Sequence, residues 1–367
     1  MELNRRTKDS WEIRLLRLLV WGYILLCFVI AGLNYGYAQN APERVALAIN
    51  SFWHFYENWI KSFLILGCGY LTIRIVGKKQ RTTMYKRNII GFSVAALAIH
   101  IVIPLVSGNP EIYFYGMPLP WSNIPLQSTL SFTDFTQRHL PLWGADGITF
   151  ALTFFWIVNI LVFIGTLIYG RRWQCSTLCL FNGFASEVFG SVLPLLSRKR
   201  KNDPKPALAI TEKTVKRFNL IRIIFFFIAV GLTIYWLLMM AGLPLDRIMP
   251  MLEKVELYKY LVFELMMMMF FWIAFIGRGY CLYCPVGTTV ALIGRLAGQR
   301  IETTETHCIS CGACSRACPV GIDVKVLAQA KEVVDNLRCV GCGHCIDACP
   351  TKTLRYTTTV LELFRKG

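Results

Sequence analysis

Two runs of cysteines near the end of the sequence share one spacing. They read Cys308-x2-Cys311-x2-Cys314-x3-Cys318-Pro319 and Cys339-x2-Cys342-x2-Cys345-x3-Cys349-Pro350. With this spacing, three close thiolates hold one [4Fe–4S] cluster and the fourth crosses to a second cluster. Structural zinc is the alternative, but its ligands usually come as two separated pairs. We therefore predict two clusters, with the ligand sets Cys308, Cys311, Cys314 and Cys349, and Cys339, Cys342, Cys345 and Cys318.

Four further cysteines each follow a Gly-Arg pair at the end of an apolar segment. The sequences are Gly170-Arg171-Arg172-Trp173-Gln174-Cys175-x3-Cys179 and Gly277-Arg278-Gly279-Tyr280-Cys281-x2-Cys284-Pro285. Each leads into an amphipathic stretch, which indicates a duplicated unit at residues 147–196 and 258–296. Two such units packed together would gather four thiolates for one iron–sulfur cluster or one tetrahedral metal. Alternatively, each pair is a local dithiol or simply packs.

The elements that position these cysteines are apolar. Of 367 residues, 55% are hydrophobic and 17% charged, and the mean hydropathy is +0.47. Membrane-spanning helices need about 20 mostly apolar residues. Six segments qualify, and we predict transmembrane helices at residues 15–37, 52–76, 88–108, 147–169, 218–242 and 258–277.

The positive charges predict the orientation of these helices. Lysine and arginine crowd residues 5–17, 78–87 and 171–217, whereas the opposite loops hold few. Cytoplasmic loops carry the excess of such residues, so we predict cytoplasmic termini and a location in the inner membrane. This bias explains most of the net charge of +17. The run Ser197–Lys201 is a solvated loop near lipid headgroups or, alternatively, a docking patch for an acidic redox partner.

Ionisable residues inside the predicted spans are candidates for function, because burying charge in lipid is costly. His54, His100 and Glu264 are the candidates, with Glu57 at a similar depth. They could line a quinone pocket, or the two histidines could ligate a haem. The alternative is that they are polar residues hydrogen-bonded between helices.

The sequence divides into two domains and a tail. Residues 1–297 are predicted to form an all-α polytopic membrane domain with six transmembrane helices. Residues 298–358 are predicted to form a small α+β domain like a bacterial ferredoxin with two [4Fe–4S] clusters, and residues 359–367 a tail. The chain has no G-x-G-x-x-G or Walker sequence and no helix–turn–helix pattern, so we expect neither nucleotide nor nucleic acid as a partner.

Residues 147–355 resemble the NapH/NosR/CcoG-type polytopic membrane ferredoxins. The resemblance rests on the spans, the paired cysteines at their ends and the tandem cluster motifs. It implies electron transfer between the quinone pool, or a cytoplasmic donor, and a redox partner. The chain departs from the family's Cys-x3-Cys-Pro pattern, since Leu180 follows Cys179 and only two residues separate Cys281 from Cys284.

These features predict a membrane-anchored subunit that passes electrons between cytoplasmic clusters and either the membrane quinone pool or a partner redox enzyme. Lipid and a redox subunit are its expected partners. The cofactors expected are two [4Fe–4S] clusters, with a third metal centre and a quinone as further candidates. Two other functions are left open. One is a cysteine-dependent copper reductase or assembly factor for an oxidase, and the other is a redox-sensing membrane regulator.

Overall fold

The computed structural model describes residues 10–77, 83–121, 123, 125–126, 135–189, 210–275, 278–334 and 336–366. Within these residues, six helical segments are long and apolar enough to cross a membrane. They are Trp11–Tyr37, Glu43–Gly77, Thr83–Ser107, Thr149–Tyr169, Glu212–Met240 and Met249–Ala274. The six apolar helices predicted from the sequence are therefore confirmed, and they indicate a membrane protein.

Most of these segments consist of more than one regular piece. The pieces are α1 (Trp11–Ala31), α2 (Glu43–Phe55), α3 (Lys61–Gly77), α4 (Thr83–Leu97), α5 (Ile103–Ser107), α7 (Phe135–Tyr169), α9 (Glu212–Met240), α10 (Met249–Tyr258) and α11 (Met267–Ala274). Short π-helical stretches join α2 to α3, α4 to α5, and α10 to α11. Such stretches are frequent at functional sites, and these three contain Glu57, His100 and Glu264.

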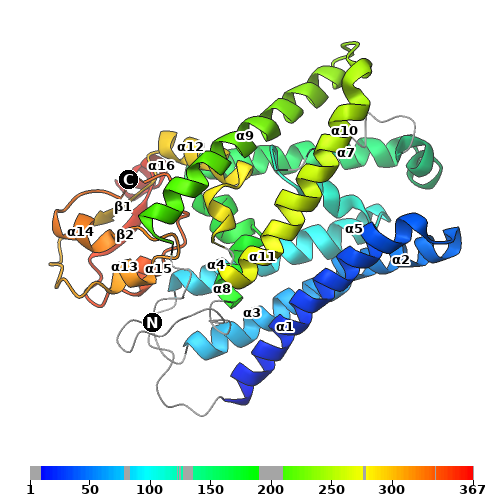
Figure 1. The fold of residues 1–367 in the computed structure, drawn as a ribbon. Helices are drawn as coiled ribbons and strands as arrows, with labels where there is room; N and C mark the ends of the chain where they lie inside the picture. The colour runs from blue at the N-terminus through cyan, green and yellow to red at the C-terminus, as the bar shows by residue number, and fades with distance from the viewer. Residues whose placement is uncertain are drawn as a thin grey trace.

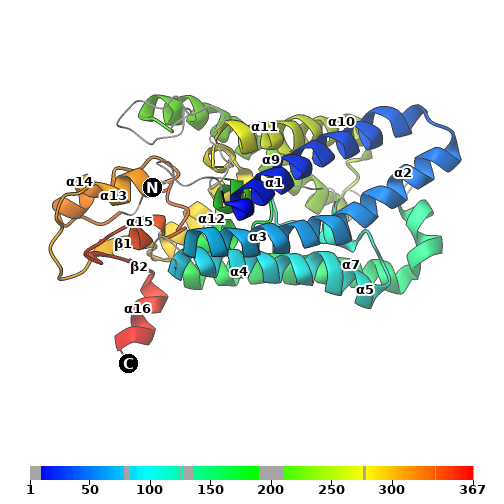
Figure 2. The same ribbon diagram turned by 90° about the horizontal axis from the view of Figure 1, so that it is seen from below.

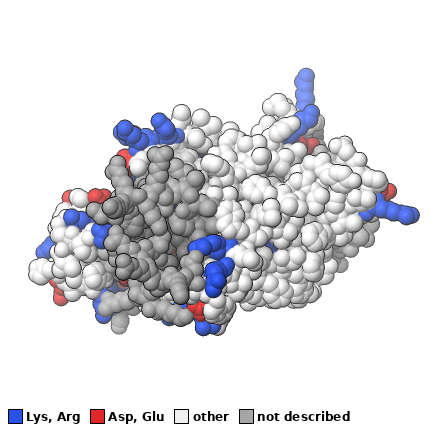
Figure 3. All heavy atoms as spheres, turned by 60° about the horizontal axis from the view of Figure 1, so that its bottom comes forward, with Lys and Arg blue, Asp and Glu red and all other residues white. Residues whose placement is uncertain are grey.

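The outer surface of the bundle is apolar. Many large apolar side chains are exposed on it, for example Leu18, Phe63, Leu161 and Phe227. Figure 3 shows a broad zone of the bundle with few charged side chains, whereas lysine and arginine gather toward the two ends of the molecule. A surface of this kind suits contact with lipid hydrocarbon, since exposed charge there is costly.

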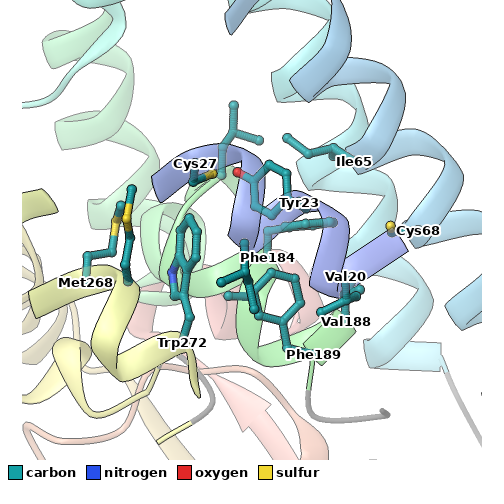
Figure 4. Close-up of a cluster of buried hydrophobic side chains, with 14 of the residues drawn as sticks. Val20, Tyr23, Cys27, Ile65, Cys68, Phe184, Val188, Phe189, Met268 and Trp272 are labelled. Carbon is teal, nitrogen blue, oxygen red and sulfur yellow. The ribbon is translucent and has the colours of Figure 1, made fainter. Parts of the chain in front are cut away.

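A short helix, α8 (Asn182–Val188), fills the middle of the bundle. Figure 4 shows Phe184, Val188 and the adjacent Phe189 packed among side chains of the spans. The ring of Phe189 lies edge-on to Trp272, with 5.7 Å between centroids, and Trp272 stacks on Tyr23. The sequence predicted an amphipathic surface stretch at residues 181–196. The described part is instead buried, and residues 190–196 lie outside the described residues.

The last sixty residues form a small domain at one end of the bundle (Figures 1 and 2). Strands β1 (Arg300–Thr303) and β2 (Leu354–Thr357) pair antiparallel, with Ile301 opposite Tyr356. Three short helices lie between the strands: α13 (Ala313–Ala317), α14 (Val324–Gln329) and α15 (His344–Asp347). The terminal helix α16 (Thr359–Lys366) projects from the side of the domain in Figure 2.

This domain contacts the ends of several spans. The carboxylate of Asp347 accepts hydrogen bonds from the backbone N–H groups of Met84 and Tyr85, the first turn of α4. Tyr356 donates to the carbonyl of Tyr169 at the end of α7. The membrane domain therefore presents the beginning of α4 and the end of α7 at the same face, as the predicted alternation of the spans requires.

Candidate metal centres and an adjoining cavity

The two cysteine runs of the small domain fold into matching loops. The first ends in α13 and the second in α15. In each loop a glycine follows the second cysteine, and Gly312 and Gly343 have φ of 68° and 77°. This left-handed conformation is open to glycine without steric cost. It lets each loop curl back between its second and third cysteines.

The fourth cysteine of each run lies with the other run. Cys318 is within electrostatic range of three thiols of the second run, Cys339, Cys342 and Cys345. Cys349 has the same relation to Cys314 of the first run. These relations agree with the predicted crossing of Cys318 and Cys349, and the full ligand sets stay a prediction.

The two cysteine runs differ in their exposure to solvent. Cys311 is exposed, whereas all four cysteines of the second run are buried. Burial raises the pKa of Cys339 to about 11 and that of Cys342 to about 12. Without metal these thiols are protonated at neutral pH, so binding iron must release protons.

The cysteines are not gathered around a single point. Across the described ranges, no three His, Cys, Asp or Glu side chains lie close enough together to hold one metal ion. A cubane binds each thiolate through a different iron. Its ligands therefore stand around the cluster rather than converging on one atom.

A buried carboxylate joins the second run to the membrane domain. Glu187 of α8 is fully buried and contacts His344 Nε2 at 2.7 Å, in the loop between Cys342 and Cys345. It also contacts Arg278 at 3.4 Å and accepts a hydrogen bond from Asn88. Burial alone would raise the pKa of Glu187, but His344, Arg278 and Asn88 outweigh it and lower the pKa.

The four juxtamembrane cysteines have matching surroundings in the two units. The first thiol of each pair faces an arginine: Arg171 Nε lies 3.4 Å from Cys175 Sγ, and Arg278 lies 3.7 Å from Cys281 Sγ. The second thiol of each pair faces a backbone N–H. Gly183 donates to Cys179 at 3.5 Å, and Gly287 donates to Cys284 at 3.4 Å. Positive charge and N–H groups both favour thiolate.

The two arginines also connect the units reciprocally. Arg171 donates to the carbonyl of Cys281 at 2.9 Å, and Arg278 donates to the carbonyl of Cys175 at 3.2 Å. Both guanidinium groups are buried. Each buried arginine therefore holds the cysteine segment of the other stretch.

The same region contacts the second cysteine run directly. Arg171 donates from its side chain to the carbonyl of Leu337 at 2.7 Å. Gln299 accepts from the backbone N–H of Arg171 at 2.6 Å and donates to the carbonyl of Cys339 at 3.1 Å. Ser176 donates to the carbonyl of Val340. One layer of side chains therefore separates the juxtamembrane cysteines from the cluster loop.

A cavity lies on the membrane side of these cysteines. It is a partly open pocket that holds about 840 Å³ of space between atoms, open solvent included, and it is lined by all four thiol residues, Cys175, Cys179, Cys281 and Cys284. Most of its remaining wall is aromatic or aliphatic. Three buried polar atoms of its lining residues, Gln174 Oε1, Asn182 Oδ1 and His100 Nδ1, have no hydrogen-bond partner among the described residues.

The predicted intramembrane residues fall into two groups. His100 and Glu57 line the cavity, with His100 Nδ1 3.9 Å from Glu57. His54 is not among the residues that line the cavity. The ring of Tyr113, which does line it, contacts the imidazoles of His54 and His100. The quinone pocket and the haem both stay predictions for these residues.

Glu264 belongs to a separate ionic group and is not among the residues that line the cavity. Its carboxylate contacts Lys259 Nζ at 2.7 Å, and Glu256 contacts the same ammonium at 2.9 Å. All three side chains are buried. A buried lysine between two carboxylates is electrostatically compensated, which gives Glu264 a structural partner that the sequence did not reveal.

Sequence reasoning did not assign roles to Arg171, Arg278, Glu187 or Gln299. For the two arginines a signal was present, since a Gly-Arg pair precedes the cysteines in both units. Glu187 and Gln299 carry no local pattern, and only the packing of distant segments gives them partners. The basic run Ser197–Lys201 lies outside the described residues.

Comparison with known proteins agrees with this site. Residues 300–350 match the family described as a 4Fe-4S dicluster domain. No curated protein and no solved structure matches the chain. The chain is thus an iron–sulfur, ferredoxin-like protein with membrane-spanning helices. The match covers the small domain alone, and the resemblance to NapH/NosR/CcoG-type proteins stays a prediction.

Proposed function

We propose that the chain transfers electrons between its ferredoxin-like domain and a quinone in the membrane. The observation that carries this proposal is the single cavity lined by the juxtamembrane cysteines Cys175, Cys179, Cys281 and Cys284. The cavity extends to His100 and Glu57 within the spans. It therefore places redox-active ligands next to a space suited to an apolar substrate.

The residues present fit iron–sulfur cofactors. The eight cysteines of the small domain supply four thiolates to each of two [4Fe–4S] clusters, in the crossed sets predicted above. The juxtamembrane four suit a third centre, since Arg171 and Arg278 balance thiolate charge in a buried position. Clusters of this kind supply one-electron transfer, at potentials set by burial, hydrogen bonds and local charge.

The cavity wall fits a quinone. Ligand pockets are mostly apolar with a few placed polar groups, and here Tyr113, Trp121 and Tyr280 provide aromatic surface. The unpartnered oxygens of Gln174 and Asn182 can accept hydrogen bonds from the hydroxyl groups of a quinol. These oxygens belong to the segment that carries Cys175 and Cys179, so they would hold the substrate beside the thiolates.

The orientation and partner belong to the same proposal. The clustering of lysine and arginine supports a cytoplasmic position for the ferredoxin-like end in the inner membrane. The first cysteine run contains the exposed Cys311 and, beside it, Ile309, which is 59% exposed. A redox partner protein would exchange electrons at this loop.

Iron content tests the cofactor part of the proposal. Anaerobically purified wild type should contain about twelve irons per chain, and the double variant Cys175→Ser, Cys281→Ser about eight. Both should give electron paramagnetic resonance signals after reduction, because the variant keeps the small domain intact. Equal iron in both proteins would overturn the third centre, and iron-free wild type would overturn the whole proposal.

Turnover tests the quinone part. Reduced wild-type protein in lipid should reduce a short-chain quinone, and the double variant should lose this activity while keeping its two clusters. If the variant keeps quinone turnover but loses copper reduction, the assembly-factor function replaces the proposed one.

A further inference from the structure

A row of titratable side chains leads from the cavity away from the ferredoxin-like domain. Tyr113 lines the cavity, and its hydroxyl lies 3.3 Å from His54 Nδ1. The other nitrogen of the His54 imidazole, Nε2, lies 2.9 Å from a carboxylate oxygen of Glu111. Glu111 follows α5, at the end of the bundle opposite the small domain in Figures 1 and 2.

Exposure increases along this row, away from the cavity. Tyr113 is 3% exposed and His54 8% exposed, whereas the side chain of Glu111 keeps 19% exposure. Glu111 is therefore the most exposed of the three side chains. A proton that leaves the cavity along this row passes through these side chains in turn.

A neighbouring tryptophan gives the row a direction. Trp53 Nε1 lies 2.8 Å from the Tyr113 oxygen, and an indole N–H can only donate. The tyrosine oxygen accepts that bond, so its own hydrogen is free to point toward His54 Nδ1. With Nδ1 accepting, a neutral imidazole has its hydrogen on Nε2, the nitrogen that lies 2.9 Å from Glu111, although this N–H is not aligned for a hydrogen bond in the structure. The order of phenol, imidazole and carboxylate thus runs outward, from the cavity to the far end.

We infer that Tyr113, His54 and Glu111 conduct the protons of the quinol to the side of the membrane opposite the ferredoxin-like domain. The inference rests on the proposed quinone function. Oxidation of one quinol gives one quinone, two electrons and two protons. The electrons leave toward the cysteine centres and the protons leave along this row, so the two charges separate across the membrane.

The experiment uses the full chain in proteoliposomes that contain quinol in the lipid and a pH-sensitive dye in the lumen. Hexaammineruthenium(III), a one-electron oxidant that does not cross the membrane, is added outside. It reaches only molecules whose ferredoxin-like domain faces outward. Two oxidant ions take up two electrons per quinol, and we expect the lumen to acidify by one proton per electron. An uncoupler should abolish this signal, and protein-free vesicles give the background.

Two variants and a matched control test the residues. Tyr113→Phe and Glu111→Gln should each slow quinol oxidation and lumen acidification together by at least 10-fold. This threshold is conservative, because loss of an acid–base group typically slows a reaction by about 100-fold or more. Tyr35→Phe removes another buried hydroxyl, one that bonds Tyr260 rather than His54, and should behave like wild type. Iron content shows that each variant is folded.

The outcomes separate the inference from the function on which it rests. Quinol oxidation with protons released outside the vesicles would overturn the inference and leave the quinone function standing. Wild-type rates of acidification in both variants would also overturn it. An absence of quinol oxidation by iron-loaded wild type would instead overturn the proposed quinone function.

Discussion

Replacing Glu187 by glutamine should loosen the contact between the ferredoxin-like domain and the membrane domain. The carboxylate is fully buried and contacts His344 at 2.7 Å and the guanidinium of Arg278 at 3.4 Å. Glutamine keeps the shape and can still bond Asn88. It removes the negative charge, so the buried guanidinium of Arg278 loses its carboxylate partner.

The magnitude follows from burial. Arg278 belongs to the membrane domain, so only the contact of Glu187 with His344 crosses between the domains. A hydrogen bond that involves a charged group contributes about 1.5–3 kcal/mol. The fraction of molecules in which the domains separate locally should therefore rise about 10-fold to 100-fold, since 1.4 kcal/mol is tenfold. The Glu187 side chain has no exposure to solvent, so little of this effect is lost to screening.

An exposed ion pair between the same two domains provides the control. Glu212 of α9 contacts Arg338 at 2.9 Å, but its side chain is 69% exposed. Exposed ion pairs contribute about 0–1 kcal/mol. Glu212→Gln should therefore raise local opening by less than about 5-fold.

Amide hydrogen exchange measures the opening. The N–H groups of Met84 and Tyr85 bond the carboxylate of Asp347 across the interface, so their exchange reports directly on docking. We expect much faster exchange at these two amides in the Glu187 variant and little change in the Glu212 variant. Similar small effects from both substitutions would refute the reasoning that the buried carboxylate holds the domains together.

Two further predictions concern packing and pH. Gly91→Ala should destabilise the protein by about 1–3 kcal/mol, because the new methyl group would lie 2.7 Å from the Thr177 carbonyl beside the juxtamembrane cysteines. Gly67→Ala, which meets nothing within 4 Å, should be neutral or slightly stabilising in the same thermal melts, and equal losses would contradict this account. The lowered pKa of Glu187 means that its stabilisation is present above the ordinary value of 4.5 and is lost as pH falls through the folded pKa. Wild type should therefore lose stability in acid more steeply than Glu187→Gln, and parallel acid profiles would exclude this role.

Local spacing was sufficient to predict the iron–sulfur domain and the apolar spans. Three cysteines at intervals of three residues restrict the chain to a tight loop, and the match of residues 300–350 to a dicluster domain agrees with that reading. A segment of about 20 apolar residues is expected to form a helix that spans the membrane, because a helix satisfies all of its backbone hydrogen bonds internally. Both signals lie within a single segment, where sequence and local structure are closely linked.

The cysteine spacing in the sequence therefore determined the kind of chemistry, and the length of the apolar segments determined that the helices lie in a membrane. Only the tertiary structure decided which of these parts meet. It set the two arginines across from each other's cysteines, placed α8 in the core, paired Glu264 with Lys259, and put His54 behind Tyr113 rather than in the cavity. Apart from Glu264 and Lys259, which are close in the sequence, the hydrogen bonds among these contacts join residues 59 to 110 positions apart. Such contacts depend on how whole helices pack, and no local pattern encodes them.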